Sequence, residues 1–156
     1  MKRITTVAEF ARFRQRVLEE EVEGRTPSLV LCAGTGGQAS GASDVLRVIK
    51  RLILEKGLQQ KISLRITGCQ GFCQMDPFVI VEPGGQLYPR LSVDDVARVV
   101  EAAAAGEVVN DLLYRDGKDF TPCASRDDIP FFRKQTRTLL GANLRIDPIR
   151  IMDYIA

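Results

Sequence analysis

Cysteines stand at the ends of two consecutive strand-like segments of this chain. Cys32 closes the apolar run 28–31, and Cys69 and Cys73 follow the alternating run 62–66. The residues between the two runs have the apolar spacing of a helix, so this part of the chain predicts a strand, a helix and a second strand. Such a crossover makes the two strands parallel, and the C-terminal ends of parallel strands open at the same edge of a sheet. We therefore expect the three thiols to meet in space.

The rest of the pattern predicts an α/β fold of thioredoxin type, built from a helix, a β-α-β unit, a β-hairpin and a further helix. A capping-box pattern at Thr6 opens the first helix, whose apolar stripe is formed by Val7, Phe10, Phe13 and Val17. Glycine-containing turns separate the later elements. We expect the first helix to end near 19–24, strands at 28–32, 62–66, 78–81 and 86–88, a small-residue loop at 33–41, and helices at 45–56 and 92–106.

A change in composition divides the chain into three parts. Residues 1–114 hold the predicted thioredoxin-like domain. Residues 115–128 are polar and contain Gly117 and Pro122, which is typical of a linker. Residues 129–156 form a predicted helical extension, with a basic helix at its start and a short helix at 149–155. Its basic residues fit a solvated helix face or a subunit contact, and they are Arg133, Lys134, Arg137, Arg145 and Arg150.

The composition excludes several kinds of chemistry. The 156 residues contain no histidine, which removes imidazole zinc sites, Rieske-type clusters and hydrolases that pair a nucleophile with histidine. The net charge is only +2, and acidic and basic residues are interspersed along the chain, so the sequence does not indicate a basic surface that binds nucleic acid. No apolar run approaches the roughly 18 residues that span a bilayer. We therefore expect a cytoplasmic protein, in which cysteines serve as ligands or reduced thiols rather than as structural disulfides.

The converging thiols predict a metal or redox site. Thiolates grouped in one pocket favour zinc, copper(I) or an iron–sulfur cluster. The Cys-x-x-Cys pair of a thioredoxin is absent from this sequence. A [2Fe–2S] cluster normally takes four thiolates, whereas the predicted pocket offers three. The candidates for the fourth ligand are the linker thiol Cys123 and the oxygen atoms of Ser40, Ser43 and Asp44.

Two cysteine-bearing segments resemble a known family. The sequence Cys-Ala-Gly-Thr-Gly at 32–36, the Ala-Ser-Gly at 39–41 and the Gly-Cys-Gln-Gly-Phe-Cys at 68–73 are similar to the thioredoxin-like [2Fe–2S] ferredoxin domain. In many bacterial complexes this domain precedes the flavin-carrying, NADH-oxidising subunit. Such subunits occur in relatives of complex I and in NAD-linked hydrogenases and formate dehydrogenases. The sequences at 129–135, 146–148 and 153–156 resemble the start of that flavin domain, so the resemblance covers nearly the whole chain.

The resemblance implies a [2Fe–2S] cluster bound by Cys32, Cys69 and Cys73, in a module that exchanges electrons with other subunits of a redox complex. The chain departs from the family at Gly37, where a cysteine is usual. It also ends before the glycine-rich segments that hold FMN and NADH in the family. We therefore expect this polypeptide to bind neither, and to be part of an NADH:acceptor oxidoreductase subunit rather than an enzyme by itself.

Two other interpretations remain open. The missing cysteine at Gly37 and the extension at 129–156 fit a cluster-free thioredoxin-like domain that docks partner subunits. The sequence Gly-Thr-Gly-Gly-Gln-Ala at 34–39 fits the dinucleotide fingerprint G-x-G-x-x-A between a strand and a helix. That fingerprint requires an acidic residue near the end of the next strand to bind ribose, and the chain has Thr-Gly-Cys at 67–69 instead.

Overall fold

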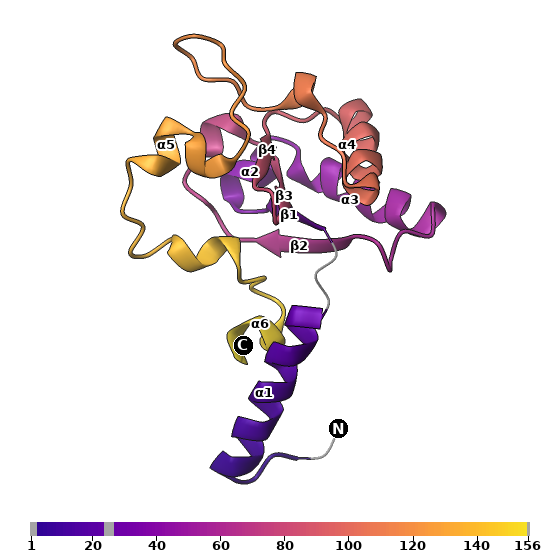
Figure 1. Cartoon of the computed structure of the whole chain (residues 1–156), viewed down its shortest axis with the longest axis vertical. Helices are drawn as coiled ribbons and strands as arrows, with labels where there is room; N and C mark the ends of the chain where they lie inside the picture. The colour runs from indigo at the N-terminus through magenta and orange to yellow at the C-terminus, as the bar shows by residue number, and fades with distance from the viewer. Residues whose placement is uncertain (1–2, 24–26, 156) are drawn as a thin grey trace.

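The computed structural model describes residues 3–23 and 27–155, and their core is a four-stranded sheet in the order β2-β1-β3-β4 (Figure 1). β1 (Ser28–Cys32) pairs in parallel with β2 (Ser63–Thr67) and antiparallel with β3 (Val79–Glu82). β3 continues into β4 (Gln86–Tyr88) as a hairpin. The expected parallel pair is therefore present, with Cys32 opposite Thr67 at its C-terminal end.

Two long helices cover one face of the sheet. α3 (Ala42–Glu55) and α4 (Val93–Ala105) contact each other and bury their apolar stripes against alternate strand residues, among them Leu29, Leu31 and Val79. Ser92 caps α4, because its hydroxyl accepts a hydrogen bond from the Asp95 amide at 3.2 Å. This face is the main hydrophobic core of the protein.

The other face is covered by the cysteine loop and the C-terminal extension. Val30, Cys32 and Ile80 point to this side and pack with Phe72, which belongs to the loop. Ile129 and α5 (Pro130–Arg133) close the cluster from outside. The helix α5 is shorter than the sequence predicts, since Lys134 and Arg137 lie beyond its end.

The extension also protects the exposed edge of the sheet at β2. The Asp147 carboxylate accepts a hydrogen bond from the Ile66 amide at 3.3 Å, and the Asp147 amide donates to the Asp153 carboxylate at 2.8 Å. Asp153 pairs with Arg65 of β2 at 3.9 Å. It lies in α6 (Ile151–Ile155), a helix that is two residues shorter than the sequence predicts. The side chain of Asp147 thus satisfies an edge amide that another chain could otherwise pair with.

The first helix does not join the sandwich. α1 (Val7–Glu23) runs away from the sheet and lies beside α6 (Figure 1). Of its predicted stripe, Val17 is buried, whereas Val7 is 86% exposed and Phe10 43% exposed. The stripe lies outside the two hydrophobic clusters of the sheet, whose free face and edge carry the extension at 129–155.

Two predicted loops contain short structured segments. The small-residue loop after β1 includes a five-residue helix, α2 (Thr35–Ala39). Further along, a 3-10 helix spans Cys73–Met75, and others span Asn110–Leu112, Arg126–Asp128 and Gly141–Leu144.

The predicted linker 115–128 contacts the hairpin, since the Arg126 guanidinium lies 3.0 Å from the Glu82 carboxylate. The proposed domain boundaries stay predictions.

None of the helices in the described part of the chain is long and apolar enough to cross a lipid bilayer.

Candidate functional site

The loops that follow β1 and β2 meet at one rim of the sheet. The Ala33 amide donates to the Thr67 carbonyl at 3.0 Å, which continues the parallel pairing beyond the strands. One residue later, Gly34 lies so close to Cys69 that a Cβ atom on it would stand 3.0 Å from the Cys69 Cβ. Glycine is required at this position because the backbone itself forms the contact between the two loops.

Cys69 and Cys73 lie side by side on the outer surface of this rim. Their sulfur atoms are 3.4 Å apart, and both are free thiols. The Gly71 amide donates to the Cys69 sulfur at 3.3 Å, and Gly71 has a left-handed backbone with φ of 80°. Two thiolates bound to one tetrahedral metal ion lie about 3.8 Å apart, for metal–sulfur bonds of about 2.3 Å. The pair is thus close to the separation that a shared metal needs.

Cys32 lies beneath this pair and is only 1% exposed. Burial is the main cause that raises the pKa of its thiol, and the charges of Asp76 and Cys69 raise it further. The backbone of Gly34 and Gln70 acts in the opposite direction and lowers this pKa. Cys32 thus lies near both loops, since groups of each influence the pKa of its thiol.

Neighbouring thiols and a carboxyl group raise the pKa of Cys73. The pKa of Cys73 is raised to about 11, first by its hydrogen bond with Cys69, then by desolvation and by the charges of Cys69, Asp76 and Cys32. Ionisation of one of these groups therefore disfavours ionisation of the others. Within residues 3–23 and 27–155, however, no three cysteine or carboxylate side chains already surround a single point as metal ligands would.

Cys123 has different surroundings. Its amide donates to the Tyr114 carbonyl at 2.8 Å, and its thiol packs at the margin of the cluster around Phe72. Burial raises its pKa first, followed by the charges of Asp116, Asp128 and Asp119. Among the oxygen donors considered above, Ser40 and Ser43 are exposed and Asp44 pairs with Arg47 at 3.3 Å.

Asp76 is the residue of this rim that sequence reasoning missed. It directly follows the 3-10 helix Cys73–Met75 and is 7% exposed. Three residues make one turn of a 3-10 helix, so residue 76 returns to the side of Cys73. The pKa of its carboxyl is raised by burial and partly lowered by the thiols of Cys32 and Cys73. The available signal was a carboxylate three residues after a candidate ligand.

Gly37, where the resembling family has a cysteine, cannot carry a side chain in this structure. A Cβ atom there would lie 2.6 Å from the Cys32 carbonyl oxygen, which is a backbone atom. We expect Gly37→Ala to lower the free energy of unfolding by about 1–3 kcal/mol, because the end of β1 and α2 must move apart. Urea unfolding measures this change.

Gly117→Ala is the matched control, since nothing lies within 4 Å of the corresponding Cβ position. We expect its effect to stay within about 0.5 kcal/mol. Equal stability of the two variants would contradict the close approach of residue 37 to β1.

The C-terminal extension covers the cysteine loop from outside. Asn143 donates from its side-chain amide to the Cys69 carbonyl at 2.6 Å, and Arg137 donates to the Gln70 carbonyl. The Arg137 guanidinium also stands over the Phe132 ring, 5.1 Å from its centre, and its charge interacts with Cys69. The extension thus fixes the loop and brings a cation close to it.

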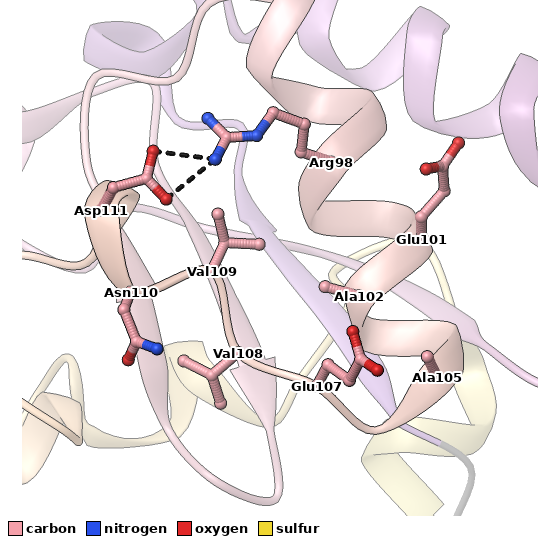
Figure 2. Close-up of a pocket in the computed structure, with 9 residues that line it drawn as sticks. All are labelled: Arg98, Glu101, Ala102, Ala105, Glu107, Val108, Val109, Asn110 and Asp111. Atoms are coloured by element: carbon pink, nitrogen blue, oxygen red, sulfur yellow. Dashed lines mark hydrogen bonds and ion pairs between the residues drawn. The ribbon is translucent and has the colours of Figure 1, made fainter.

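A separate surface hollow lies between the end of α4 and the segment 107–111, and Figure 2 shows the residues that line it. Arg98 reaches across it and donates to both Asp111 carboxylate oxygens at 2.8 Å. No cysteine lines this hollow. Its charged groups are exposed, Arg98 pairs with Asp111 and Glu101 pairs with Lys56 outside the hollow, so it carries no argument for a binding site.

Comparison with known proteins finds similarity to 2Fe-2S ferredoxins. No protein-family profile matches the chain. A 2Fe-2S ferredoxin of Clostridium pasteurianum is 38% identical over 58 residues, which are 36% of this chain and 57% of that protein. A 2Fe-2S ferredoxin of Aquifex aeolicus is 40% identical over 53 residues, 33% of this chain and 48% of that protein. The chain thus spans about half the length of these curated relatives.

Among solved structures, the thioredoxin-like [2Fe-2S] ferredoxin from Aquifex aeolicus superposes with a TM-score of 0.53 and 24% identity. The superposition covers 58% of this chain and 98% of the ferredoxin. The fold is that of a thioredoxin-like ferredoxin. This confirms the fold class expected from the sequence, and it tests neither the ligand roles of individual cysteines nor the flavin-subunit context.

Proposed function

We propose that the chain is an electron-transfer module that binds a [2Fe–2S] cluster through Cys32, Cys69 and Cys73. The observation that carries this proposal is the meeting of the two cysteine loops at one rim of the sheet, with Cys69 and Cys73 sulfur atoms 3.4 Å apart. When bound, such a cluster takes up and releases one electron at a time. The similarity to 2Fe-2S ferredoxins supports the same conclusion.

The surroundings of the thiols fit such a cluster. The Gly71 amide donates to the Cys69 sulfur, and hydrogen bonds to sulfur are one means by which a protein sets cluster potential. Phe72 keeps water from the inner side of the site, since it is 6% exposed and packs against four other aromatic rings. Cys73 is exposed, so the outer side of the site is accessible to a redox partner.

The site does not fit the dinucleotide alternative. Gly36, the second glycine of that fingerprint, faces Cys73, whose sulfur would lie 3.1 Å from a Cβ atom on it. In a dinucleotide site this glycine lets the pyrophosphate approach the backbone, and here the cysteine loop fills that space.

The host of the module is proposed on the resemblance alone. We propose that it belongs to an NADH-oxidising redox complex in the cytoplasm, with other subunits as electron partners and with FMN and NADH bound by a flavin domain downstream. The extension at 129–155 supports this arrangement, because it packs on the ferredoxin-like part through Ile129 and Phe132 and leaves Ile149 and Tyr154 exposed. A cluster-free docking domain is the competing function, favoured by the loss of the usual cysteine at Gly37.

Metal analysis separates these functions. The full chain, expressed without oxygen and reconstituted with ferrous iron and sulfide, is expected to retain about two iron and two sulfide per chain after gel filtration. A folded, colourless protein that holds neither would support the docking domain. A chain that retains one zinc ion and excludes iron would identify a different metal centre.

A further inference from the structure

The carboxylate of Asp76 is buried without a polar partner. The residue is 7% exposed, and neither of its oxygen atoms makes a hydrogen bond within the described structure. A buried carboxylate that lacks partners is strongly unfavourable, so native proteins pair such groups, neutralise them or bind metals with them. The partner of Asp76 must therefore be a proton or a group that the polypeptide itself does not supply.

The location of Asp76 favours a metal centre as that partner. Its carboxylate lies next to the thiols of Cys32 and Cys73, which face it without completing hydrogen-bond geometry. One carboxylate oxygen would lie 3.7 Å from a Cβ atom on Gly36, and the Cys73 sulfur 3.1 Å from the same point. The carboxylate therefore points into the space between the two loops rather than into solvent.

The backbone holds Asp76 in this place from both sides. Its amide donates to the Cys73 carbonyl at 3.1 Å, and the Leu91 amide donates to the Pro77 carbonyl at 2.8 Å. The Arg90 amide also donates to the Met75 carbonyl at 2.9 Å. These bonds fix the segment that follows Cys73 against the start of α4, so the carboxylate does not depend on a mobile loop for its orientation.

We propose that Asp76 is the fourth ligand of the cluster, so that three thiolates and one carboxylate hold it. The inference rests on the proposed function, since it assigns the ligand that Cys32, Cys69 and Cys73 leave missing. It replaces the candidates considered from the sequence. Ser40, Ser43 and Asp44 are exposed, and Cys123 packs at the margin of the apolar cluster around Phe72, with Asp116 and Asp128 as its main charged neighbours. Carboxylate oxygen is a harder ligand than thiolate, which gives the site a distinct spectroscopic signature.

The experiment compares the wild-type chain with Asp76→Asn, Asp76→Cys and the control Asp94→Asn, which alters an exposed carboxylate at the start of α4. All four proteins are reconstituted with ⁵⁷Fe and sulfide. Mössbauer spectra of the oxidised proteins, iron retention against a chelator and urea unfolding are then measured.

We expect two ferric sites of clearly different isomer shift in the wild-type protein, the larger one from the oxygen-bound iron. Asp76→Cys should retain the cluster, bring the two isomer shifts together and strengthen the sulfur-to-iron absorption. Asp76→Asn should lose iron to the chelator at least 10–100 times faster, because even the loss of an outer partner of a metal ligand has an effect of about that size. Asp94→Asn should match the wild type.

An Asp76→Asn protein that keeps the wild-type isomer shifts and iron retention would overturn the assignment while leaving the proposed function intact. A wild-type chain that takes up no cluster would overturn both. If Asp76→Asn does not fold, the isomer shifts of the wild type and of Asp76→Cys still decide the question, and identical shifts would refute oxygen ligation.

Discussion

Cys69→Ser is expected to abolish stable binding of the cluster, with iron and sulfide falling to less than about a tenth of the wild-type content. Cys69 is one of the two closely spaced thiols, and its sulfur also receives the Gly71 amide. Serine replaces the soft thiolate with a weakly acidic hydroxyl, which is a poor ligand for an iron–sulfur centre at neutral pH. Cys32→Ser and Cys73→Ser are expected to have the same effect, measured by iron and sulfide analysis after gel filtration.

Cys123→Ser serves as the matched control for these variants. The thiol of Cys123 lies among Tyr114, Asp116 and Asp128 rather than among the other cysteines, so its loss should leave the iron content unchanged. Loss of the cluster in Cys123→Ser together with normal binding in Asp76→Asn would assign the fourth ligand to the linker thiol instead. Normal iron content in Cys69→Ser would contradict the proposed site altogether.

Phe72→Ala is expected to be the most destabilising single substitution around the site, lowering the free energy of unfolding by about 3–5 kcal/mol. Phe72 stacks on Phe131 at 4.3 Å between ring centres and meets Phe132 edge-on at 5.2 Å. It also contacts Phe78 and Tyr114 at 6.4 Å and 5.7 Å. Its removal leaves a cavity exactly between the cysteine loop and the extension, so both segments should become more mobile. Urea unfolding and hydrogen exchange of the 69–73 amides measure the two effects.

Phe120→Ala provides the comparison, since this ring is 71% exposed. We expect its stability to lie within about 0.5 kcal/mol of the wild type. If Phe72→Ala is no more destabilising than Phe120→Ala, the extension does not pack on the cysteine loop as described.

The central architecture could be predicted from the sequence because it depends on local patterns. Apolar alternation and helical spacing indicate the β-α-β unit, and the parallel strands of such a unit place Cys32 and the Cys69 loop at one edge. The register of β1 with β2 confirms this placement, with Cys32 opposite Thr67. The bounds of β2 and β3 differ from the prediction by one residue, and α3 begins at Ala42 rather than at Val45.

Asp76 could not be identified in the same way, since its role depends on burial rather than on spacing. In sequence it is an ordinary acidic residue in a turn, and a 3-10 helix with the packing of 75–77 against Arg90 and Leu91 is needed to turn it inward. The surroundings of helix α1 could not be predicted from the sequence for a related reason. Its stripe of Val7, Phe10 and Phe13 predicts a buried face, but which surface remains free for it depends on long-range packing of the extension.

Electron paramagnetic resonance of the reconstituted full chain, after reduction with dithionite, tests directly whether the chain binds a [2Fe–2S] cluster. A [2Fe–2S] cluster reduced by one electron pairs one ferric with one ferrous iron. We therefore expect a rhombic S = 1/2 signal of about one spin per two iron atoms, present in the wild type and lost in Cys69→Ser. A folded protein that contains iron yet yields no such signal on reduction, or one whose signal survives Cys69→Ser unchanged, would contradict this expectation.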